Sequence, residues 1–324
     1  MGSPFGPADW RLEILIAHSN NDRYKHQGLQ SERMNLLKEQ VDYSRGCQLP
    51  LNEWLWLNRI GAFQDPVLRK YVSPFPPRKL MQNVSGLKNP KDFASHGADL
   101  YLAISQASIR ALTDYKNILD FGCGCGRLAR MFKGHPHHMS ACDVDRRHIA
   151  WLQTNLGFVS ASCTSVHPPL PYDTGAFDCV ISISVFSHLN EASQDEFLQE
   201  LRRISALGAH LFLSFHGKRA LERAIAEPSI RKMIAVNEGC FQAAREKFAA
   251  DEHAFIVQRG HLTTKNASWL KRFLVVIKEL FEYGISFIPE KYVRSRWTRW
   301  FNVIDYRSGA IHDFQDIAVL MPKK

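Results

Sequence analysis

From residue 116 onward, the chain alternates between short apolar runs and segments with helical periodicity. The strand-like runs are NILDF (117–121), HMSACDVD (138–145), FVSASC (158–163), CVISISV (179–185) and AHLFLSF (209–215). Helical patterns follow the first, second and fourth of these runs, over 126–132, 146–156 and 191–205. Asp145 is placed to cap the second of these helices. Strands that alternate with helices favour a parallel sheet covered by helices.

The end of the chain breaks this alternation. FNVIDY (301–306) and QDIAVLM (315–321) are strand-like and are joined by RSGAIHDF. This connection is too short for a crossover helix, so the two runs are predicted to form an antiparallel hairpin.

Two regions lie outside the alternating part. Residues 1–90 are helical or irregular, with a proline-rich segment at 73–79, and we predict that they form a cap region. Residues 217–288 carry helical apolar spacing, for example in WLKRFLVVIKELF (269–281), and are predicted to be a mainly helical insertion. The main domain is therefore expected over 91–324, interrupted by this insertion.

Composition and charge limit the classes of protein that remain. No apolar run approaches the ~18 residues of a membrane span, and the N-terminal segment contains Asp9, Arg11 and Glu13, so we expect a cytoplasmic protein. Seven scattered cysteines lack the paired spacing of a disulfide framework. The net charge of +9 suits an anionic partner, but without a dense block of Lys and Arg a generic basic surface is favoured.

The stretch ILDFGCGCGRLAR (118–130) follows the first strand-like run with glycines at 122, 124 and 126. Glycines between a strand and a helix allow the backbone to approach a ligand closely, which favours a nucleotide-like ligand. A dinucleotide fingerprint needs its third glycine at position 127, which is Arg127. A phosphate-binding P-loop needs a Gly-Lys-Ser/Thr sequence, which is absent from this stretch. Both alternatives are therefore disfavoured.

Asp120 followed by G-x-G-x-G resembles the first motif of class I S-adenosylmethionine-dependent methyltransferases. PPLPYDTGAFDCVISISVFSHL (168–189) is similar to the fourth-strand region of the family, and residues 283–320 resemble the terminal hairpin of members that act on small molecules or glycans. Residues 76–93 are more weakly similar to a leader before the domain. The resemblance implies a Rossmann-like, doubly wound, seven-stranded sheet that is mostly parallel, with a C-terminal antiparallel hairpin. It also implies S-adenosyl-L-methionine as cofactor.

The resemblance implies a cofactor site along the first two strands and the end of the fourth. Asp120 is expected to bind the ammonium group of the cofactor. Asp143 lies about 20 residues beyond the glycines, where nucleoside-binding folds place a carboxylate for the ribose hydroxyls. Asp145 is its rival but is assigned to capping. The predicted cofactor-binding residues are Asp120, Phe121, Gly122, Cys123, Gly124, Gly126, Asp143, Val144, Ser184 and Val185.

His188 follows the fourth strand and is the first candidate for a catalytic residue. A general base and a histidine that only contacts the cofactor are equally compatible with that position. His216, after the fifth strand, is a second candidate. The family often carries an acidic residue for adenine after the third strand, whereas this chain has Cys163, Thr164 and Ser165. Backbone atoms are one alternative for binding adenine.

Three other clusters have a functional and a structural interpretation. Cys123, Cys125 and Cys142, and the histidines of GHPHH (134–138), lack the spacing typical of zinc sites, and we predict no metal. KYVRSRWTRW (291–300) interleaves basic and aromatic residues as nucleic-acid binders do. An amphipathic helix with Trp297 and Trp300 packed inward is the favoured interpretation.

The sequence thus predicts a methyltransferase that moves a methyl group to an O or N atom of a small molecule or glycan. An RNA or DNA methyltransferase is the first alternative, and a catalytically degenerate binding subunit is the second. Enzymes that methylate adenine N6 carry a [DNS]-P-P-[YFW] motif after the fourth strand, where this chain reads SISVF. The intact glycine motif and Asp143 argue against the degenerate alternative.

Overall fold

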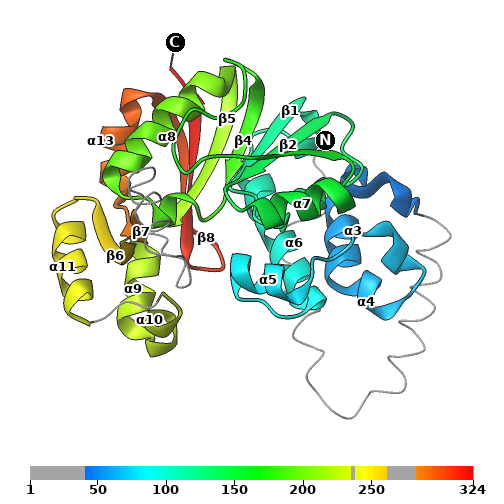
Figure 1. Ribbon diagram of the computed structural model, residues 1–324, viewed down its shortest axis with the longest axis horizontal. Helices are drawn as coiled ribbons and strands as arrows, with labels where there is room; N and C mark the ends of the chain where they lie inside the picture. The colour runs from blue at the N-terminus through cyan, green and yellow to red at the C-terminus, as the bar shows by residue number, and fades with distance from the viewer. Residues whose placement is uncertain (1–40, 235–237, 261–281, 324) are drawn as a thin grey trace, which may run out of the picture. The chain divides into compact units, whose positions relative to one another are not determined.

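The computed structural model describes residues 41–234, 238–260 and 282–323. Arg45–Lys324 forms one compact unit, and a nine-stranded sheet runs through its described part (Figure 1). The strands are β1 (Asn117–Phe121), β2 (His138–Asp143), β3 (Val159–Cys163), β4 (Phe177–Ser182), β5 (Ser205–His216), β6 (Ala254–Gly260), β7 (Glu282–Phe287), β8 (Phe301–Ile311) and β9 (Gln315–Pro322).

The first five strands form a parallel layer in the order β3-β2-β1-β4-β5. β9 pairs with β5 in the antiparallel direction, and β8 pairs with β9. These seven strands form the predicted doubly wound sheet with its C-terminal hairpin. Strand order reverses between β1 and β4, and open α/β sheets bind ligands beyond the carboxyl ends of such a pair.

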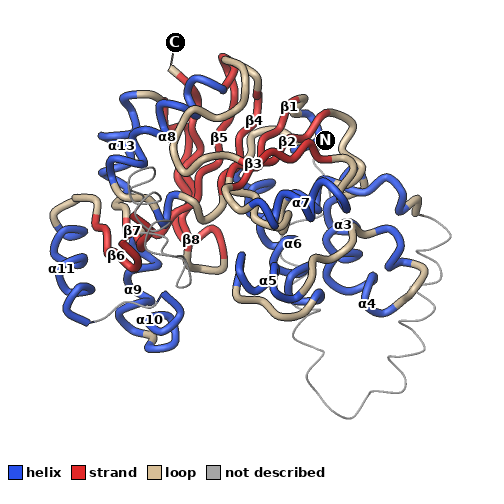
Figure 2. The backbone as a smooth tube through the Cα atoms, in the orientation of Figure 1, coloured by secondary structure: helices blue, strands red, loops and turns tan. Residues whose placement is uncertain are grey.

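Helices cover the sheet and extend beyond it (Figure 2). The α-helices are α3 (Leu51–Trp56), α4 (Ala62–Gln64), α5 (Arg78–Ser85), α6 (Pro90–Ala107), α7 (Arg146–Asn155), α8 (Glu191–Ile204), α9 (Lys218–Ala226), α10 (Pro228–Ile234), α11 (Glu238–Ala249) and α13 (Glu290–Arg296). The Asp145 side chain caps α7 by accepting a hydrogen bond from the amide of Arg147, as predicted.

One of the core clusters lies between the sheet and the helices α8 and α13. Leu211, Leu213 and Phe215 alternate along β5 and pack with side chains of α8. Trp297, directly after α13, is fully buried in this cluster, and Trp300 packs against it. The segment that interleaves basic and aromatic residues therefore turns its tryptophans inward, as the amphipathic interpretation predicted.

The connection between β1 and β2 differs from the prediction. Instead of a helix over 126–132, the structure has a single 3₁₀ turn at Ala129–Phe132. Gly126 has φ 80°, a left-handed conformation that does not continue an α-helix. The guanidinium group of Arg130 is buried and donates to the carbonyl of Ser73, so tertiary contacts hold this segment in its irregular path.

The region predicted as a mainly helical insertion also contains two strands. α9, α10 and α11 fill its first half, but β6 and β7 follow and pair in the antiparallel direction. β7 also meets the end of β5, at His216 and Phe287. The helix predicted over 269–281 lies outside the described residues.

The N-terminal boundary near residue 90 stays a prediction. Residues 1–40 of the proposed cap region lie outside the described residues, and α3, α4 and α5 belong to the same compact unit as the sheet. Among the helices of the described ranges, none combines the length and the apolar character that a membrane span requires.

Candidate functional site

A cavity of about 750 Å³ opens at the carboxyl ends of β1, β2 and β4. We call it the main cavity. Its loop end is lined by the first three residues of the glycine loop (122–126) together with Asp120 and Asp143, and its histidine end is lined by His188, Leu189 and Tyr283. Of the predicted site residues, the structure brings together in its lining Asp120, Phe121, Gly122, Cys123, Gly124, Asp143, Val144, Ser184, Val185 and His188. It leaves Gly126 and His216 outside that lining.

The glycine loop is pinned to the end of β2. The amides of Gly122 and Cys123 both donate to the carbonyl of Cys142, at 2.8 and 3.0 Å. Gly122 and Gly124 have φ of 74° and 54°, the left-handed region that favours glycine. A Cβ atom at Gly124 would lie 2.7 Å from a methyl group of Val84 in α5. The bare backbone thus allows α5 to pack against the loop.

Asp143 both shapes the loop and faces the cavity. Its Oδ2 accepts a hydrogen bond from the amide of Gly124 and its Oδ1 accepts one from the amide of Asp145, each at 2.8 Å. Each carboxylate oxygen has a second lone pair for a further donor. The position suits two vicinal hydroxyl groups, as in a ribose.

Asp120 is almost fully buried at the loop end, with an exposed fraction of 2%. Its Oδ2 has no hydrogen-bond partner among the described residues. Its pKa is raised to about 7, chiefly by burial and also by the charge of Asp143, while Arg127 and a backbone hydrogen bond from Ala129 oppose the rise. A buried carboxylate oxygen without a hydrogen-bond partner is costly, and a cationic group in the cavity would relieve that cost.

His188 is held in one orientation at the histidine end. Its Nδ1 lies 2.9 Å from the carbonyl oxygen of Gly284, and its ring stacks on Tyr283 with centroids 4.6 Å apart. Burial lowers its pKa, so the ring is neutral at pH 7. Since a carbonyl only accepts, Nδ1 carries the proton and Nε2 carries the lone pair.

His216, the second predicted catalytic residue, lies behind the cavity. Its ring packs against Phe287 and Phe314, and its exposed fraction is 4%. Burial and the neighbouring His188 lower its pKa to about 3. The pairing of β5 with β7 and β9 surrounds this position, which the sequence did not indicate.

Gly126, the remaining predicted residue outside the lining, has a packing role. A Cβ atom there would lie 3.0 Å from Leu156 and 3.5 Å from Leu152. This glycine therefore lets the loop approach α7 and the residue that follows it.

Ser184 has an unusual backbone conformation for a non-glycine residue, with φ 63°. Its backbone amide donates to the hydroxyl of Ser214 in β5 at 2.8 Å, and its own hydroxyl accepts from the side-chain Nε2 of Gln315 in β9 at 2.9 Å. Such strain persists only where surrounding contacts enforce it, and it is common at ligand sites. These contacts fix the turn that leads from β4 to His188.

The cavity also contains residues that sequence reasoning missed. His148 of α7 is buried, with Nδ1 3.7 Å from Oδ1 of Asp143. Arg127 is buried beside the glycine loop, and Tyr283 comes from β7. The spacing of His148, three residues after the helix cap, was a usable signal. Tyr283 had none, because its position depends on a strand pairing within the insertion.

The segment after β3 lines the cavity without an acidic residue. Thr164 and Ser165 line it, whereas Cys163 is exposed and does not. The amide of Thr164 donates to the carbonyl of Asp143 at 3.0 Å, which ties this segment to β2. The hydroxyl groups of Thr164 and Ser165 and the backbone of this segment are the polar groups that it offers for binding a nucleobase.

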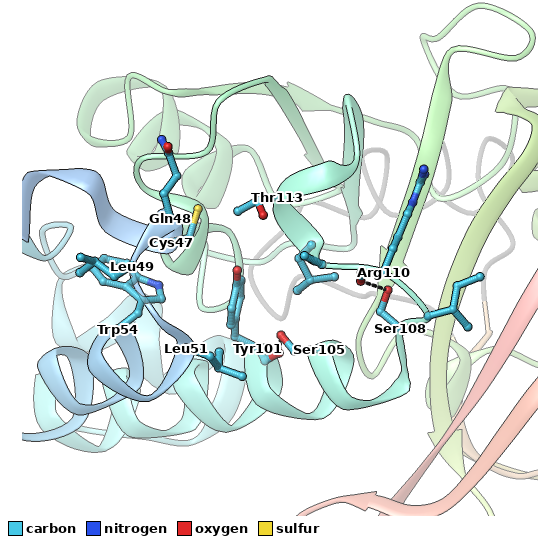
Figure 3. A pocket seen from close by; sticks show the side chains of 13 residues that line it. Cys47, Gln48, Leu49, Leu51, Trp54, Tyr101, Ser105, Ser108, Arg110 and Thr113 are labelled. Carbon is cyan, nitrogen blue, oxygen red and sulfur yellow. Dashed lines mark hydrogen bonds between the residues drawn. The ribbon is translucent and has the colours of Figure 1, made fainter. Parts of the chain in front are cut away.

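A second cavity, of about 460 Å³, lies between α3, α6 and residues 108–113 (Figure 3). Cys47, Trp54 and Tyr101 contribute to its lining, and it contains none of the predicted site residues. Within the described ranges, no group of three His, Cys, Asp or Glu residues is arranged to hold a metal ion. All seven cysteines are free thiols.

Comparison with known proteins adds three findings. Residues 118–208 match the model of a family described as methyltransferase domain. The chain is 30% identical over 112 residues to ajmaline N-methyltransferase of Rauvolfia serpentina, an alignment that covers 33% of this chain and 38% of that protein. The fold is similar to that of the PH0226 protein of Pyrococcus horikoshii OT3, with a TM-score of 0.51 at 12% identity, over 77% of this chain and 100% of the other.

Proposed function

We propose, on the match of residues 118–208 to a methyltransferase domain, that the chain is a class I S-adenosylmethionine-dependent methyltransferase and transfers a methyl group to an O or N atom of a small molecule or glycan. The observation that carries the proposal is a neutral histidine whose tautomer is set by a backbone carbonyl, in the same cavity as the glycine loop.

The loop end has groups that complement S-adenosylmethionine. The remaining lone pairs of Asp143 suit the ribose hydroxyls, and the unpartnered Oδ2 of Asp120 suits the ammonium group. Thr164 and Ser165 line the same cavity, and their hydroxyl groups suit hydrogen bonds with the adenine. When bound, the cofactor supplies an electrophilic methyl group for in-line displacement.

His188 acts as the general base in this proposal. The Nδ1–H group donates a hydrogen bond to the carbonyl of Gly284, so Nε2 is the atom that takes the proton from the hydroxyl or amine that is methylated. Stacking on Tyr283 limits rotation of the ring. Most of the remaining catalysis comes from alignment of the two reactants and exclusion of water.

Cavity size and lining support a small acceptor. A volume of about 750 Å³ is within the ~300–1,000 Å³ typical of small-molecule sites. Leu189 and Phe197 contribute apolar lining close to His188 in sequence. The name of the aligned plant relative indicates transfer to a nitrogen atom, but the alignment covers 38% of that protein.

The basic segment near the C-terminus gives little support to the nucleic-acid alternative. Arg294 pairs with Glu290 and Arg296 pairs with Asp195, each at 2.7 Å. Trp297 is fully buried and has no ring surface for stacking on a base. The charges of these two arginines and the ring of Trp297 are thus engaged in contacts within the fold.

The proposal is tested by incubating the protein with methyl-labelled cofactor and a panel of phenols, amines, glycans, peptides and RNA. We expect label on a hydroxyl or amine of a small acceptor, and loss of transfer in His188→Ala. Label on RNA alone would overturn the acceptor class. Cofactor binding without transfer to any member of a broad panel would favour the binding-subunit alternative.

A further inference from the structure

Gln315 of β9 is a buried residue that the proposed mechanism does not use. The exposed fraction of this residue is 9%. Its Nε2 donates to the hydroxyl of Ser184 at 2.9 Å, and its Oε1 accepts a hydrogen bond from the hydroxyl of Ser214 at 2.8 Å. Ser184 follows β4 and Ser214 lies in β5, which are 131 and 101 positions away from Gln315 in the sequence. One side chain of the C-terminal hairpin therefore joins the ends of two parallel strands.

These hydrogen bonds meet at Ser184, whose backbone is strained. Its φ of 63° lies in the left-handed region, which residues other than glycine rarely adopt. Its amide donates to the hydroxyl of Ser214 at 2.8 Å, and its carbonyl accepts from the hydroxyl of Ser187 at 2.9 Å. Both of these partner serines are fully buried. The amide, the carbonyl and the side chain of Ser184 thus each have a partner, and a strained conformation persists where such contacts enforce it.

The turn at Ser184 sets the path of the residues that lead to His188. The next residue, Val185, packs against the glycine loop, where a Cβ atom at Gly122 would lie 2.2 Å from a methyl group of Val185. The carbonyl of Val185 then accepts from the amide of His188 at 2.9 Å, which closes a single 3₁₀ turn. A change of φ at Ser184 would rotate this turn and move the His188 ring away from the carbonyl of Gly284.

We propose that Gln315 is a positioning residue for the general base. Together with Ser214, it holds Ser184 in the left-handed conformation, and that conformation directs Nε2 of His188 into the main cavity. The role of His188 as a base rests on the proposed function, whereas the placement of its ring does not. A residue that only packed the hairpin against β5 would not affect the ring of His188 when it is replaced.

Nitrogen-15 NMR of the histidine rings tests this placement without relying on turnover. The His188 signals are those that disappear in His188→Ala, and in the native protein at pH 7 we expect the Nδ1–H tautomer alone. Gln315→Met keeps the length of the side chain but removes both hydrogen bonds. We expect a mixture of the two neutral tautomers, because the ring is no longer held beside the carbonyl of Gly284. The Nδ1–H tautomer alone in Gln315→Met would overturn the proposal.

A glycine in place of Ser184 separates positioning from packing, since glycine adopts the left-handed conformation without strain. Gln315→Met should lower turnover about 5- to 30-fold in the native background. In a Ser184→Gly background the same substitution should lower turnover by less than about threefold, with each ratio taken within its own background. Equal losses in both backgrounds would reduce Gln315 to a packing role.

Gln153→Met is the matched control. It removes the same amide from α7, where Nε2 of Gln153 donates to the carbonyl of Ala161 at 2.8 Å and the residue does not line the main cavity. This variant should retain the native turnover and the single tautomer of His188. A mixture of tautomers here as well would contradict a specific role for Gln315.

Ser214→Ala is the second variant if Gln315→Met does not fold. It removes only the hydroxyl that accepts from the amide of Ser184 and donates to Gln315. We expect a mixture of His188 tautomers in this variant too, and the native tautomer alone would count against the proposal.

Failure of this proposal and failure of the proposed function can be told apart. If the native protein transfers no methyl group to any acceptor, the proposed function fails, and the tautomer of His188 still decides the role of Gln315. If the native protein transfers methyl groups and Gln315→Met retains the native rate, only the positioning role fails.

Discussion

The loop end and the histidine end of the main cavity are assembled differently. The loop end comes from β1, β2 and their connection, so its residues are close in sequence. The histidine end combines His188, which follows β4, with Tyr283 and Gly284 of β7. Its geometry depends on contacts between residues that are far apart in the sequence: His188 and Gly284, which share a hydrogen bond, are separated by 96 positions. Changes at the loop end should therefore alter cofactor binding, and changes at the histidine end should alter turnover.

The largest effect on cofactor binding is expected from Gly124→Val. The new side chain would combine a left-handed backbone with a close contact to Val84, so the loop and α5 would separate. We expect cofactor affinity to fall at least 100-fold in calorimetry, a loss of about 3 kcal/mol.

Gly208→Ala is the control for Gly124→Val, since Gly208 also has a positive φ but a Cβ atom there meets nothing within 4 Å. Gly124→Ala combined with Val84→Ala should recover part of the affinity. Native affinity in Gly124→Val would contradict a ligand site at the loop end.

His188→Ala should separate the two ends most clearly. Loss of a general base lowers turnover by ~10²–10⁴, whereas cofactor affinity should stay nearly unchanged. Steady-state kinetics and calorimetry on the same preparation measure both. A parallel fall in affinity would instead identify His188 as a cofactor contact, and native rates at every pH would remove it from the mechanism.

Asp143→Ala should weaken cofactor binding by about 1–3 kcal/mol. The substitution removes the acceptor for the ribose and also the anchor for the amide of Gly124. Asp145→Ala is the comparison, because that carboxylate caps α7 and should affect thermal stability more than affinity. A larger loss of affinity in Asp145→Ala would reverse the two assignments.

The smallest effect concerns pH. Asp120 has a pKa raised to about 7 by burial, so it is ionised above that pH and neutral below it. A bound ammonium group favours the ionised form, and cofactor affinity should therefore fall by up to about tenfold for each pH unit below pH 7. Asp120→Asn should bind more weakly and with little pH dependence. A flat profile in the native protein would separate Asp120 from the ammonium group.

Much of the loop end was predictable because its signals are local. NILDF became β1 with the predicted bounds, and Asp145 caps α7 as expected. The glycine pattern required a backbone conformation that few other residues adopt, so spacing alone located the loop. The burial of Arg127 in the cavity lining was not predicted, because a charged side chain after a glycine is ordinarily solvated.

By itself, the sequence determined the order of β1 to β5, the C-terminal hairpin of β8 and β9, and a ligand site at the ends of β1 and β4. These follow from periodicity and turn residues, which act over a few positions. Only the tertiary structure decided which buried groups stay unpaired in that cavity and that β7 reaches across to orient His188. The unpaired groups result from burial, and the position of β7 results from long-range strand pairing. No local sequence pattern predicts either feature, because both depend on distant segments of the chain that pack nearby.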